Sequence, residues 1–477
     1  MGKIRVPRMK IILITAFVCC LTAIAAAQPV DLSRLNSSQA GKRVVEYFNT
    51  FNTGDEEKLR AFFLENIAPQ ALKERPVEPR LEFHRQLRTD VRKVEIKKIV
   101  SVGSDEIVVL VQSVNGQWVS YGFGIDPTTT KFLGFRIEQA EAPGEKQNEF
   151  ADHAAPTTIP EATATADKLF SDLAKADAFS GVVMIAKDGK PVFSNAYGLA
   201  NIETKTPNNI NTRFNIGSIN KDFTVVAIGQ LMRQGKLAWD DKLIKVLPEY
   251  PNKEAAEKIT IGQLVTMRSG IGDFVNDEFW SMDRSKLRDL TDFFKLFATK
   301  PLLFEPGTSR RYSNGGYVVL GLIIEKLSGT NYYDYVRENV FKPAGMNDTD
   351  SYFMEKLPPN TAFGYTVHHQ NTPGRGRNNT ILSSRGSSAG GGYSTASDLL
   401  KFIAALRSRK LEMPDDNGLF REKFGGIGTA GGSEGVNALL EVDERSGYTV
   451  IVLSNIDPPS AEKPGMKLME WLKNIKQ

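Results

Sequence analysis

A serine and a lysine three positions apart are the residues of this chain best suited to chemistry. They are Ser218 and Lys221, and the two residues between them are Ile219 and Asn220. On a helix, residues at i and i+3 lie on one face, one turn apart. A serine hydroxyl is a poor nucleophile until a base takes its proton, and a lysine is such a base only where burial or nearby positive charge lowers its pKa. The pair therefore predicts nucleophilic catalysis by Ser218 with Lys221 as the base.

The residues that follow predict the helix that positions this pair. Apolar residues recur at helical spacing as Phe223, Val226, Ala227 and Leu231. This pattern is typical of a buried helix, and Gly235 ends it. Gly217 and Ser218 together resemble a helix start, where free N–H groups and the positive end of the helix dipole favour an oxyanion. The alternative is that Ser218 only caps the helix and that Lys221 is a solvated residue of its first turn.

Two further sequence patterns contain residue types suited to such a site. Ser-x-x-Lys also occurs at residues 460–463, but prolines at 458, 459 and 464 make a buried catalytic helix there unfavourable. Tyr-x-Asn occurs several times, and only the copy at 312–314 follows Glu305-Pro306-Gly307 and precedes a predicted buried helix at 317–327.

Other hydrolase and cofactor patterns fail on their context. Gly-x-Ser-x-Gly occurs at 386–390 and 431–435, but an α/β-hydrolase needs its histidine after the serine, and the last histidine is His369. With His84, His153 and the pair at 368–369 as the only histidines, a zinc site is not expected. The glycines of 426–431 imitate a dinucleotide fingerprint without the βαβ unit that it requires.

The motifs in their order resemble the serine β-lactamase and penicillin-binding superfamily. Ser218-x-x-Lys221 comes first, the 312–314 motif follows, and a glycine-rich turn at 429–433 enters a strand. The class C β-lactamase-like branch, which includes esterases and D-amino-acid peptidases, is the most similar. The resemblance covers about residues 165–477. It implies an α/β (α+β) fold, in which helices flank an antiparallel sheet and a mainly helical subdomain is added.

The resemblance also implies six site residues, three catalytic and three substrate-binding: Ser218, Lys221, Tyr312, Asn314, Gly431 and Gly432. Ser218 would be acylated, and Lys221 and Tyr312 would share proton transfer. Asn314 would hold the substrate amide or orient Lys221. The backbone N–H groups of Ser218 and Gly432 would form the oxyanion hole. No metal or cofactor is implied. Purely structural roles remain as alternatives, with Tyr312 as a core aromatic residue and Asn314 as a helix cap.

Two positions depart from the family pattern. Thr429 stands where a lysine or histidine is usual, and Met267 stands where a histidine is frequent. The missing cation argues against binding of a substrate carboxylate at this position, unless Arg385 or Arg421 replaces the cation. We therefore expect an exported serine acyl hydrolase that acts on esters, amides or peptides, as an esterase, D-amino-acid peptidase or β-lactamase-like enzyme. The alternative is a non-turnover or inactive ligand-binding or sensing protein on the same fold.

Residues 1–27 predict a signal peptide. The segment has an apolar run at 11–24, a small-residue cleavage site at 25–27, and a basic start formed by Lys3, Arg5, Arg8 and Lys10. Both cysteines, Cys19 and Cys20, lie in it, so no disulfide is expected in the mature chain. The predicted localisation is periplasmic or secreted.

The charge balance excludes partners that need a basic surface. The chain has 60 Lys and Arg against 56 Asp and Glu, a formal charge of +4. Four of the basic residues belong to the predicted signal peptide, so the mature chain is balanced. No nucleic-acid partner and no span of the membrane is expected, and the partner is a small-molecule or peptide substrate.

The chain ahead of the hydrolase region predicts an accessory domain at 35–140. Two helical patterns in 38–64 precede short strands at 94–96, 107–111, 118–121 and 132–137, with a hairpin turn at Asn115-Gly116. Helices followed by a curved sheet resemble the cone-shaped domains of the nuclear transport factor and ketosteroid isomerase group. A homodimer through this domain is a further expectation.

A linker at 141–160 leads to the hydrolase domain at 161–477. There a hairpin at 182–197 and late strands at 437–442 and 448–453 should share one antiparallel sheet, with a last helix at about 462–473. Between them, 218–420 should be mainly helices and loops.

Overall fold

The structure, a computed structural model of the chain, describes residues 31–114, 116, 118–140, 150, 153–367, 374–414 and 428–475. The predicted signal peptide, the adjacent histidines at 368–369 and Arg421 lie outside the described residues. Within the described part of the chain, no helix has the length and apolar character that crossing a bilayer requires.

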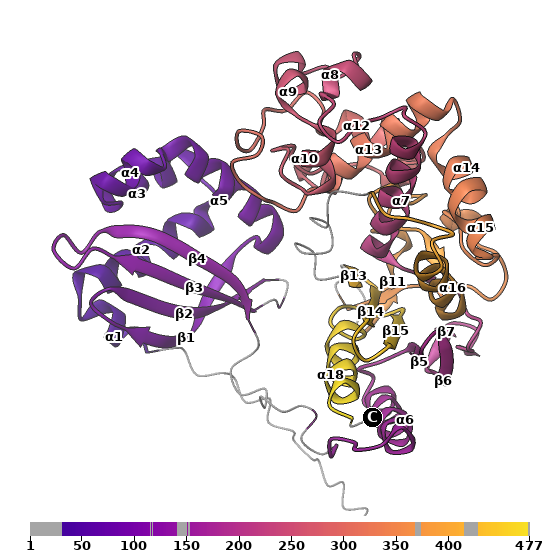
Figure 1. Cartoon of the computed structure of the whole chain (residues 1–477). Helices are drawn as coiled ribbons and strands as arrows, with labels where there is room; N and C mark the ends of the chain where they lie inside the picture. Colours follow the sequence, from indigo (N-terminus) through magenta and orange to yellow (C-terminus); the bar gives the residue numbers. More distant parts are fainter. Residues whose placement is uncertain are drawn as a thin grey trace, which may run out of the picture.

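The first region is a layer of helices against an antiparallel sheet (Figure 1). Its elements are α1 (Ser33–Asn36), α2 (Gln39–Thr53), α3 (Glu56–Asn66), α4 (Pro69–Glu74), α5 (Val77–Val91), β1 (Val94–Val102), β2 (Glu106–Ser113), β3 (Trp118–Ile125) and β4 (Phe132–Ala140). The strands pair in the order β1-β2-β3-β4, each antiparallel to its neighbour. The predicted order of helices before sheet is confirmed. The resemblance to the cone-shaped group stays a prediction.

Local signals set the ends of the helices in this region. Gly54 adopts the left-handed conformation at φ 73° and ends α2. The Asp55 side chain then accepts the Lys58 N–H and starts α3. The two helical patterns expected within 38–64 correspond to α2 and α3. The proposed turn residue Asn115 lies outside the described residues, and Gly116 has a φ of 82°.

The sequence analysis missed α4 and α5. The buried face of α5 includes Leu81, His84, Leu87 and Val91. His84 therefore occupies a core position, and it interrupts the apolar stripe by which a helix is recognised. It is 2% exposed, its Nδ1 contacts the Arg80 carbonyl oxygen at 2.7 Å, and burial lowers its pKa to about 4. The imidazole is thus neutral at physiological pH.

The second region is built on another antiparallel sheet. Its strands are β5 (Gly181–Lys187), β6 (Lys190–Tyr197), β13 (Gly428–Ser433), β14 (Val436–Asp443) and β15 (Tyr448–Ser454). They pair in the order β13-β14-β15-β5-β6, so β15 lies beside β5 and the first and last strands of the region share one sheet. The predicted sheet is confirmed, and β13 forms one of its edges.

Helices cover both faces of this sheet (Figure 1). On one face, α6 (Ile159–Lys175) and α18 (Glu462–Lys473) bury Phe170 and Trp471 against strand residues such as Val183 and Val452. On the other, α7 (Asn220–Arg233) and α16 (Ala396–Arg407) share a core with Val182. The alternation of strand residues between the two faces explains both cores.

A mainly helical subdomain fills the middle of the chain, as predicted. Its helices are α8 (Leu243–Val246), α9 (Lys253–Lys258), α10 (Ile261–Val265), α11 (Asp277–Ser281), α12 (Leu290–Lys295), α13 (Asn314–Ser328), α14 (Tyr332–Val336) and α15 (Lys342–Ala344). Short strands connect it to the sheet region: β7 (Leu199–Asn201), β8 (Thr206–Pro207), β9 (Phe214–Asn215), β10 (Tyr365–Thr366), β11 (Gly376–Arg377) and β12 (Tyr393–Ser394). Short single-turn segments are η1 (Gly217–Ile219), η2 (Arg284–Lys286), η3 (Arg337–Phe341), η4 (Met354–Lys356) and η5 (Asn378–Thr380).

Helix α7 is buried on nearly all sides. Phe223 is 0% exposed, and its ring lies 5.0 Å from the ring of Phe341 and 5.0 Å from that of Phe402, edge to face in both cases. Removing a ring from such a site costs about 3–5 kcal/mol. This packing fixes the direction of α7 and therefore the place of the residues at its first turn.

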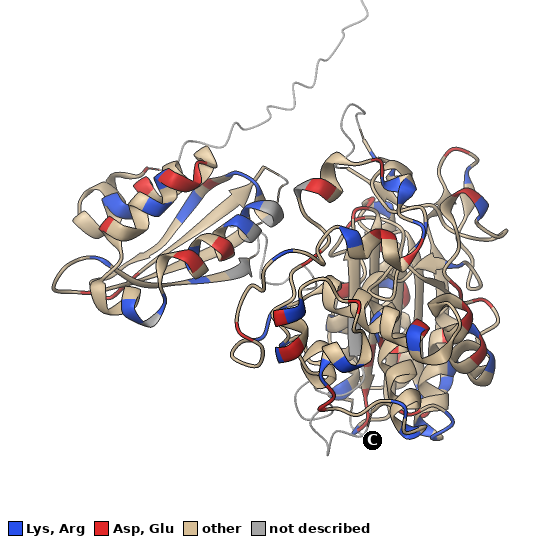
Figure 2. Cartoon of the chain, turned by 90° about the horizontal axis from the view of Figure 1, so that it is seen from above, with Lys and Arg blue, Asp and Glu red and all other residues tan. Residues whose placement is uncertain are grey.

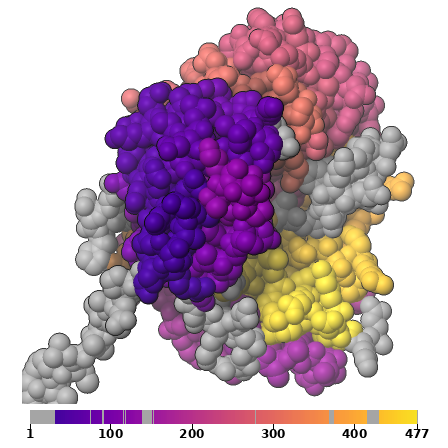
Figure 3. Space-filling view, turned by 90° about the vertical axis from the view of Figure 1, so that its left-hand side faces the viewer, coloured from indigo at the N-terminus to yellow at the C-terminus, as the bar shows by residue number. Residues whose placement is uncertain are grey.

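The two regions have separate cores. One core runs from Leu35 to Phe132 in the sequence, and the cores of the second region lie between Phe150 and Leu472. The space-filling view shows the first region as one continuous indigo-to-purple lobe (Figure 3). Lys, Arg, Asp and Glu are intermingled over the ribbon (Figure 2), which agrees with the balanced charge. Part of the expected linker is packed against the second region. The centre of the Phe150 ring lies 6.4 Å from the centre of the Trp471 ring, and α6 already begins at Ile159.

Since the cores are separate, we predict that residues 145–477 fold without the first region. The shortened chain should unfold in one cooperative transition in urea, followed by circular dichroism. Its m-value should be smaller than that of the mature chain, because less surface is exposed on unfolding. A shortened chain without a cooperative transition would contradict separate folding.

Candidate active site

Ser218 lies in the short turn η1, directly ahead of α7. Its neighbours Ile219 and Asn220 are 0% and 2% exposed, and the Asn220 Nδ2 donates to the Ser387 carbonyl oxygen at 2.9 Å. Neither η1 nor α7 has a side-chain cap, so the alternative of Ser218 as a helix cap is wrong. The Ser218 Oγ instead lies 2.5 Å from the Tyr312 hydroxyl and 3.2 Å from the Lys221 Nζ.

Lys221 is 4% exposed and has acceptors on three separate segments of the chain. Its Nζ donates to the Ser218 Oγ at 3.2 Å, to the Asn314 Oδ1 at 2.7 Å and to the Ala389 carbonyl oxygen. Burial lowers the pKa of Lys221 to about 7, and the negative charges of Asp273 and Asp222 oppose this shift. The alternative of Lys221 as a solvated residue is therefore wrong, and a neutral amine is accessible near physiological pH.

Tyr312 lies in the loop before α13, with its side chain 49% exposed and its hydroxyl directed at Ser218. The Lys221 Nζ lies 4.7 Å from the centre of this ring, a cation–π arrangement. The residue is half exposed, but loss of water around its hydroxyl group raises the pKa of Tyr312 to about 12, and the hydrogen bond with Ser218 opposes the rise. The phenol therefore keeps its proton at neutral pH. Half exposure also contradicts the alternative that Tyr312 is a core aromatic residue.

Asn314 is the first residue of α13, and the helix is capped by the neighbouring Ser313, whose Oγ accepts the Gly316 N–H. The Asn314 side chain therefore does not cap the helix. Its Oδ1 accepts from Lys221, and its Nδ2 donates to the Asp273 Oδ2 at 2.9 Å. Asp273 is a site residue that the sequence analysis missed, because no spacing rule connects it with the lysine. Its only signal in the sequence was that it is the one charged residue of the short segment 270–275.

The glycine pair of the third motif lies beside the nucleophile. A Cβ built on Gly217, which has a φ of 50°, would lie 3.0 Å from the Gly431 Cα and 3.0 Å from the Gly432 N. A Cβ on Gly431 would lie 2.2 Å from the Ile216 carbonyl oxygen. Only glycines allow strand β13 to approach η1 this closely. All six residues predicted for the site are thus brought together.

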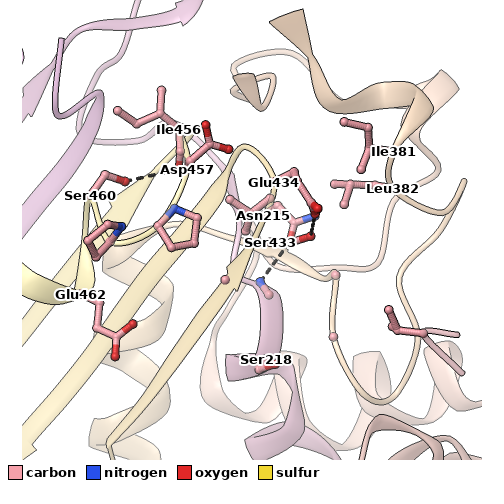
Figure 4. Close-up of a pocket in the computed structure, with 18 of the residues that line it drawn as sticks. Asn215, Ser218, Ile381, Leu382, Ser433, Glu434, Ile456, Asp457, Ser460 and Glu462 are labelled. Carbon is pink, nitrogen blue, oxygen red and sulfur yellow. Dashed lines mark hydrogen bonds between the residues drawn. The ribbon is translucent and has the colours of Figure 1, made fainter. Parts of the chain in front are cut away.

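A cleft of about 2340 Å³ opens in front of Ser218. Figure 4 shows Ser218 at the start of its helix, with the turn of Ser433 and Glu434 above it and Ile381 and Leu382 across from it. The wall of the cleft also includes the aromatic residues Phe274, Phe279 and Trp280. Trp118 and Arg92 of the first region line the cleft as well. The lining is mixed, because charged residues such as Arg284, Glu434 and Asp457 lie in the same cleft as these aromatic side chains.

The two departures from the family pattern lie at different places. The backbone of Thr429 pairs with Leu440 in the edge strand β13. Met267 is 8% exposed and part of the core, with a φ of 57°.

Arg385, one of the two alternatives for the missing cation, makes its contacts with other residues. Its guanidinium lies 3.5 Å from the centre of the Tyr333 ring and donates to the Ser351 carbonyl oxygen at 2.8 Å. Arg284 is a cleft residue that the sequence analysis missed, and its Nη2 donates to the Thr380 carbonyl oxygen at 2.7 Å.

Comparisons with known proteins agree with this geometry. The family model described as Beta-lactamase matches residues 166–468, more than half of the chain. Penicillin-binding protein 4* of Bacillus subtilis is 34% identical over 209 residues, which are 42% of this chain and 46% of that protein. The chain thus spans less than half the length of this relative. The putative penicillin-binding protein PbpX of Bacillus subtilis is 29% identical over 310 residues, 62% of this chain and 75% of that protein.

Solved structures give the same result. A penicillin-binding protein from Bacillus halodurans matches with a TM-score of 0.55 and 29% identity, over 63% of this chain and 98% of that one. A D-amino acid amidase from Ochrobactrum anthropi SV3 matches with a TM-score of 0.56 over 66% of this chain and 99% of that one, at 22% identity that supports the fold alone. The predicted fold class and resemblance are confirmed, and the chain belongs to the Beta-lactamase family.

Proposed function

We propose that the protein is an exported serine acyl hydrolase that works through an acyl-enzyme on Ser218. One observation carries the proposal: the Ser218 Oγ lies between a buried lysine amine at 3.2 Å and a phenol hydroxyl at 2.5 Å. A nucleophile that contacts a base, with the base oriented by a third group, is the arrangement of covalent acyl transfer. Here the third group is Asn314, which accepts from Lys221 at 2.7 Å.

In the first step the neutral Lys221 amine takes the Ser218 proton while the Oγ attacks the substrate carbonyl carbon. The carbonyl oxygen becomes an oxyanion, for which the N–H groups of Ser218 and Gly432 are the proposed donors. Tyr312 passes a proton to the leaving alcohol or amine as its bond to carbon breaks, and the protonated Lys221 restores the proton of Tyr312. Water then attacks the acyl carbon while Lys221 takes one of its protons. The bond between the acyl carbon and the Ser218 Oγ breaks, Tyr312 gives its proton to the Oγ and regains one from Lys221, and the acid is released.

The proposed substrates are esters, amides or peptides that reach the cleft in front of Ser218. The apolar wall formed by Ile381, Leu382 and Trp280 favours an apolar acyl or side-chain group. Thr429 at the position of the usual cation favours substrates without a carboxylate at that end. Export through residues 1–27 and a homodimer through residues 35–140 are parts of the same proposal.

The first prediction concerns pH. Lys221 must be neutral to act as base, so kcat/KM for an activated ester should rise tenfold per pH unit below about 7 and level off above it. The phenol of Tyr312, with a pKa of about 12, should not limit the plateau. Stopped-flow or steady-state rates between pH 5 and 9 measure the profile. A rate that still rises tenfold per pH unit up to pH 9 would contradict the lowered pKa of Lys221, and a rate independent of pH over this range would exclude Lys221 as the base.

The second prediction concerns Gly217. In the Gly217→Ala variant the new methyl group meets Gly431 and Gly432 at 3.0 Å, in a left-handed backbone that alanine adopts at a cost. Strand β13 should move away from η1. We therefore expect kcat to fall by at least about tenfold, and by no more than the loss that follows removal of one oxyanion donor. Gly189→Ala, in the turn between β5 and β6 at a φ of 76° with open space around it, is the matched control and should keep kcat. Equal kcat in both variants would contradict the close approach.

The third prediction tests the proposed function itself. Wild-type protein and Ser218→Ala are mixed with p-nitrophenyl butyrate, and turnover and intact mass are followed. The wild type should release nitrophenol continuously, whereas Ser218→Ala should show neither turnover nor an acyl adduct and should keep its thermal unfolding temperature.

Benzylpenicillin is run in parallel. A penicillin adduct that persists for hours without ester turnover would support the non-turnover sensing protein instead. Unchanged turnover in Ser218→Ala would exclude a nucleophilic role for this serine.

A further inference from the structure

The side-chain amide of Asn314 lies between two charged groups. On one side its Oδ1 accepts from the Lys221 Nζ at 2.7 Å. On the other its Nδ2 donates to the Asp273 Oδ2 at 2.9 Å. Asp273 comes from the loop ahead of α11, which is a different segment from those that carry Ser218 and Tyr312.

Asp273 is itself held by backbone groups. Its Oδ2 also accepts the Asn314 N–H at 3.0 Å, and its Oδ1 accepts the Val275 N–H at 3.0 Å. Burial raises the pKa of Asp273, and the N–H groups of Val275 and Asn314 and the charge of Lys221 oppose this rise. All three contacts are N–H donors, so they fix the orientation of the ionised carboxylate, which can only accept. The NH2 group of Asn314 must therefore face Asp273, and its oxygen must face Lys221.

We propose that Asp273 is a positioning residue for hydrolysis: it fixes the orientation of the Asn314 amide, which in turn holds the Lys221 amine against the Ser218 Oγ. This inference rests on the proposed function, and it adds to it a residue that touches neither the substrate nor the nucleophile.

Loss of the carboxylate has a defined chemical consequence. With an amide in place of the carboxylate at position 273, its NH2 group would face either the Val275 N–H or the two N–H donors of Asn314. In the second case, rotation of the Asn314 amide would relieve the contact between the two side chains. The turned amide would present its NH2 group to Lys221, where an ammonium group finds no acceptor. The lysine would then lose one of the three acceptors that hold it, and its distance from Ser218 would no longer be fixed.

The charged and titratable groups around Lys221 give the direction of the accompanying pH effect. Asp222 acts on it from the same helix, and Asp273 acts on it from the loop ahead of α11. The rings of Tyr312 and Tyr317 lie 4.7 Å and 5.5 Å from the Nζ. Both carboxylates raise the pKa of Lys221 against the effect of burial, so removal of either charge lowers it.

The test is Asp273→Asn in the mature full-length protein with p-nitrophenyl butyrate. We expect kcat to fall by about 10- to 100-fold, the effect of a buried polar group left without its partner. KM should stay within about twofold, because Asp273 does not line the cleft. The acid limb of the kcat/KM profile should move to lower pH. A loss of activity with an unmoved acid limb and a lower unfolding temperature would show a merely structural role and overturn the proposal.

Two further variants separate charge from orientation. Asp222→Asn removes a neighbouring charge, and it should move the acid limb to lower pH while keeping the plateau of kcat within about threefold. The double variant Asp273→Asn with Asn314→Asp restores the side-chain pair, since the new amide at position 273 would donate to a carboxylate at position 314 that accepts from Lys221. Only the backbone N–H of residue 314 would then lose its acceptor. Its kcat should exceed that of Asp273→Asn by about tenfold, with the acid limb at higher pH. A double variant no better than the single one would overturn the proposal.

Labelling of Ser218 by a fluorophosphonate probe, followed by intact mass, distinguishes the two proposals. A wild type that is neither labelled nor active fails the proposed function. A wild type that is labelled, with Asp273→Asn labelled at the same rate, fails only the role of Asp273.

Discussion

The burial of one lysine amine is the constraint on which the rest of the site depends. Lys221 is 4% exposed, and an ammonium group without partners at such a position would be very costly. Its three acceptors come from η1, from the start of α13 and from the loop that contains Ala389. The last two of these segments are distant from the lysine in sequence, so the amine is satisfied only when the helical subdomain is fully packed. Lys221 therefore acquires its acceptors only as these distant segments pack together.

The packing of α7 and the edge of the sheet meet at the nucleophile. Phe223 anchors α7 between two aromatic rings, and this sets where its first turn lies. From the other side, β13 approaches η1 so closely that Gly217 and Gly431 have no room for a side chain. Ser218 is thus held between a buried helix and a strand edge, two rigid elements. A nucleophile on such a support keeps its geometry better than one on a free loop.

Much of this organisation could be predicted from the sequence, for physical reasons that differ between elements. The hairpin of β5 and β6 and the helix α18 follow directly from β-branched runs and helical periodicity. Helix α5 could not be predicted in the same way, because His84 occupies its buried face. Asp273 could not be predicted either, since a contact with a residue 41 positions away along the chain leaves no periodic signal. The orientation of Arg385 toward Tyr333 could not be predicted from the spacing of residues in the sequence either.

The division of roles between the lysine and the tyrosine follows from how burial acts on each. The ordinary pKa values of the two side chains are nearly equal, at about 10.4 and about 10. Burial disfavours the charged form of both, which is the protonated amine but the deprotonated phenol. The same cause therefore lowers the pKa of Lys221 to about 7 and raises that of Tyr312 to about 12. Two groups that would compete for one proton in water thus differ in protonation, one as a neutral amine and the other as a protonated phenol. Both contact the Ser218 Oγ, so in the proposed reaction Lys221 would take the serine proton and Tyr312 would supply the proton of the leaving group.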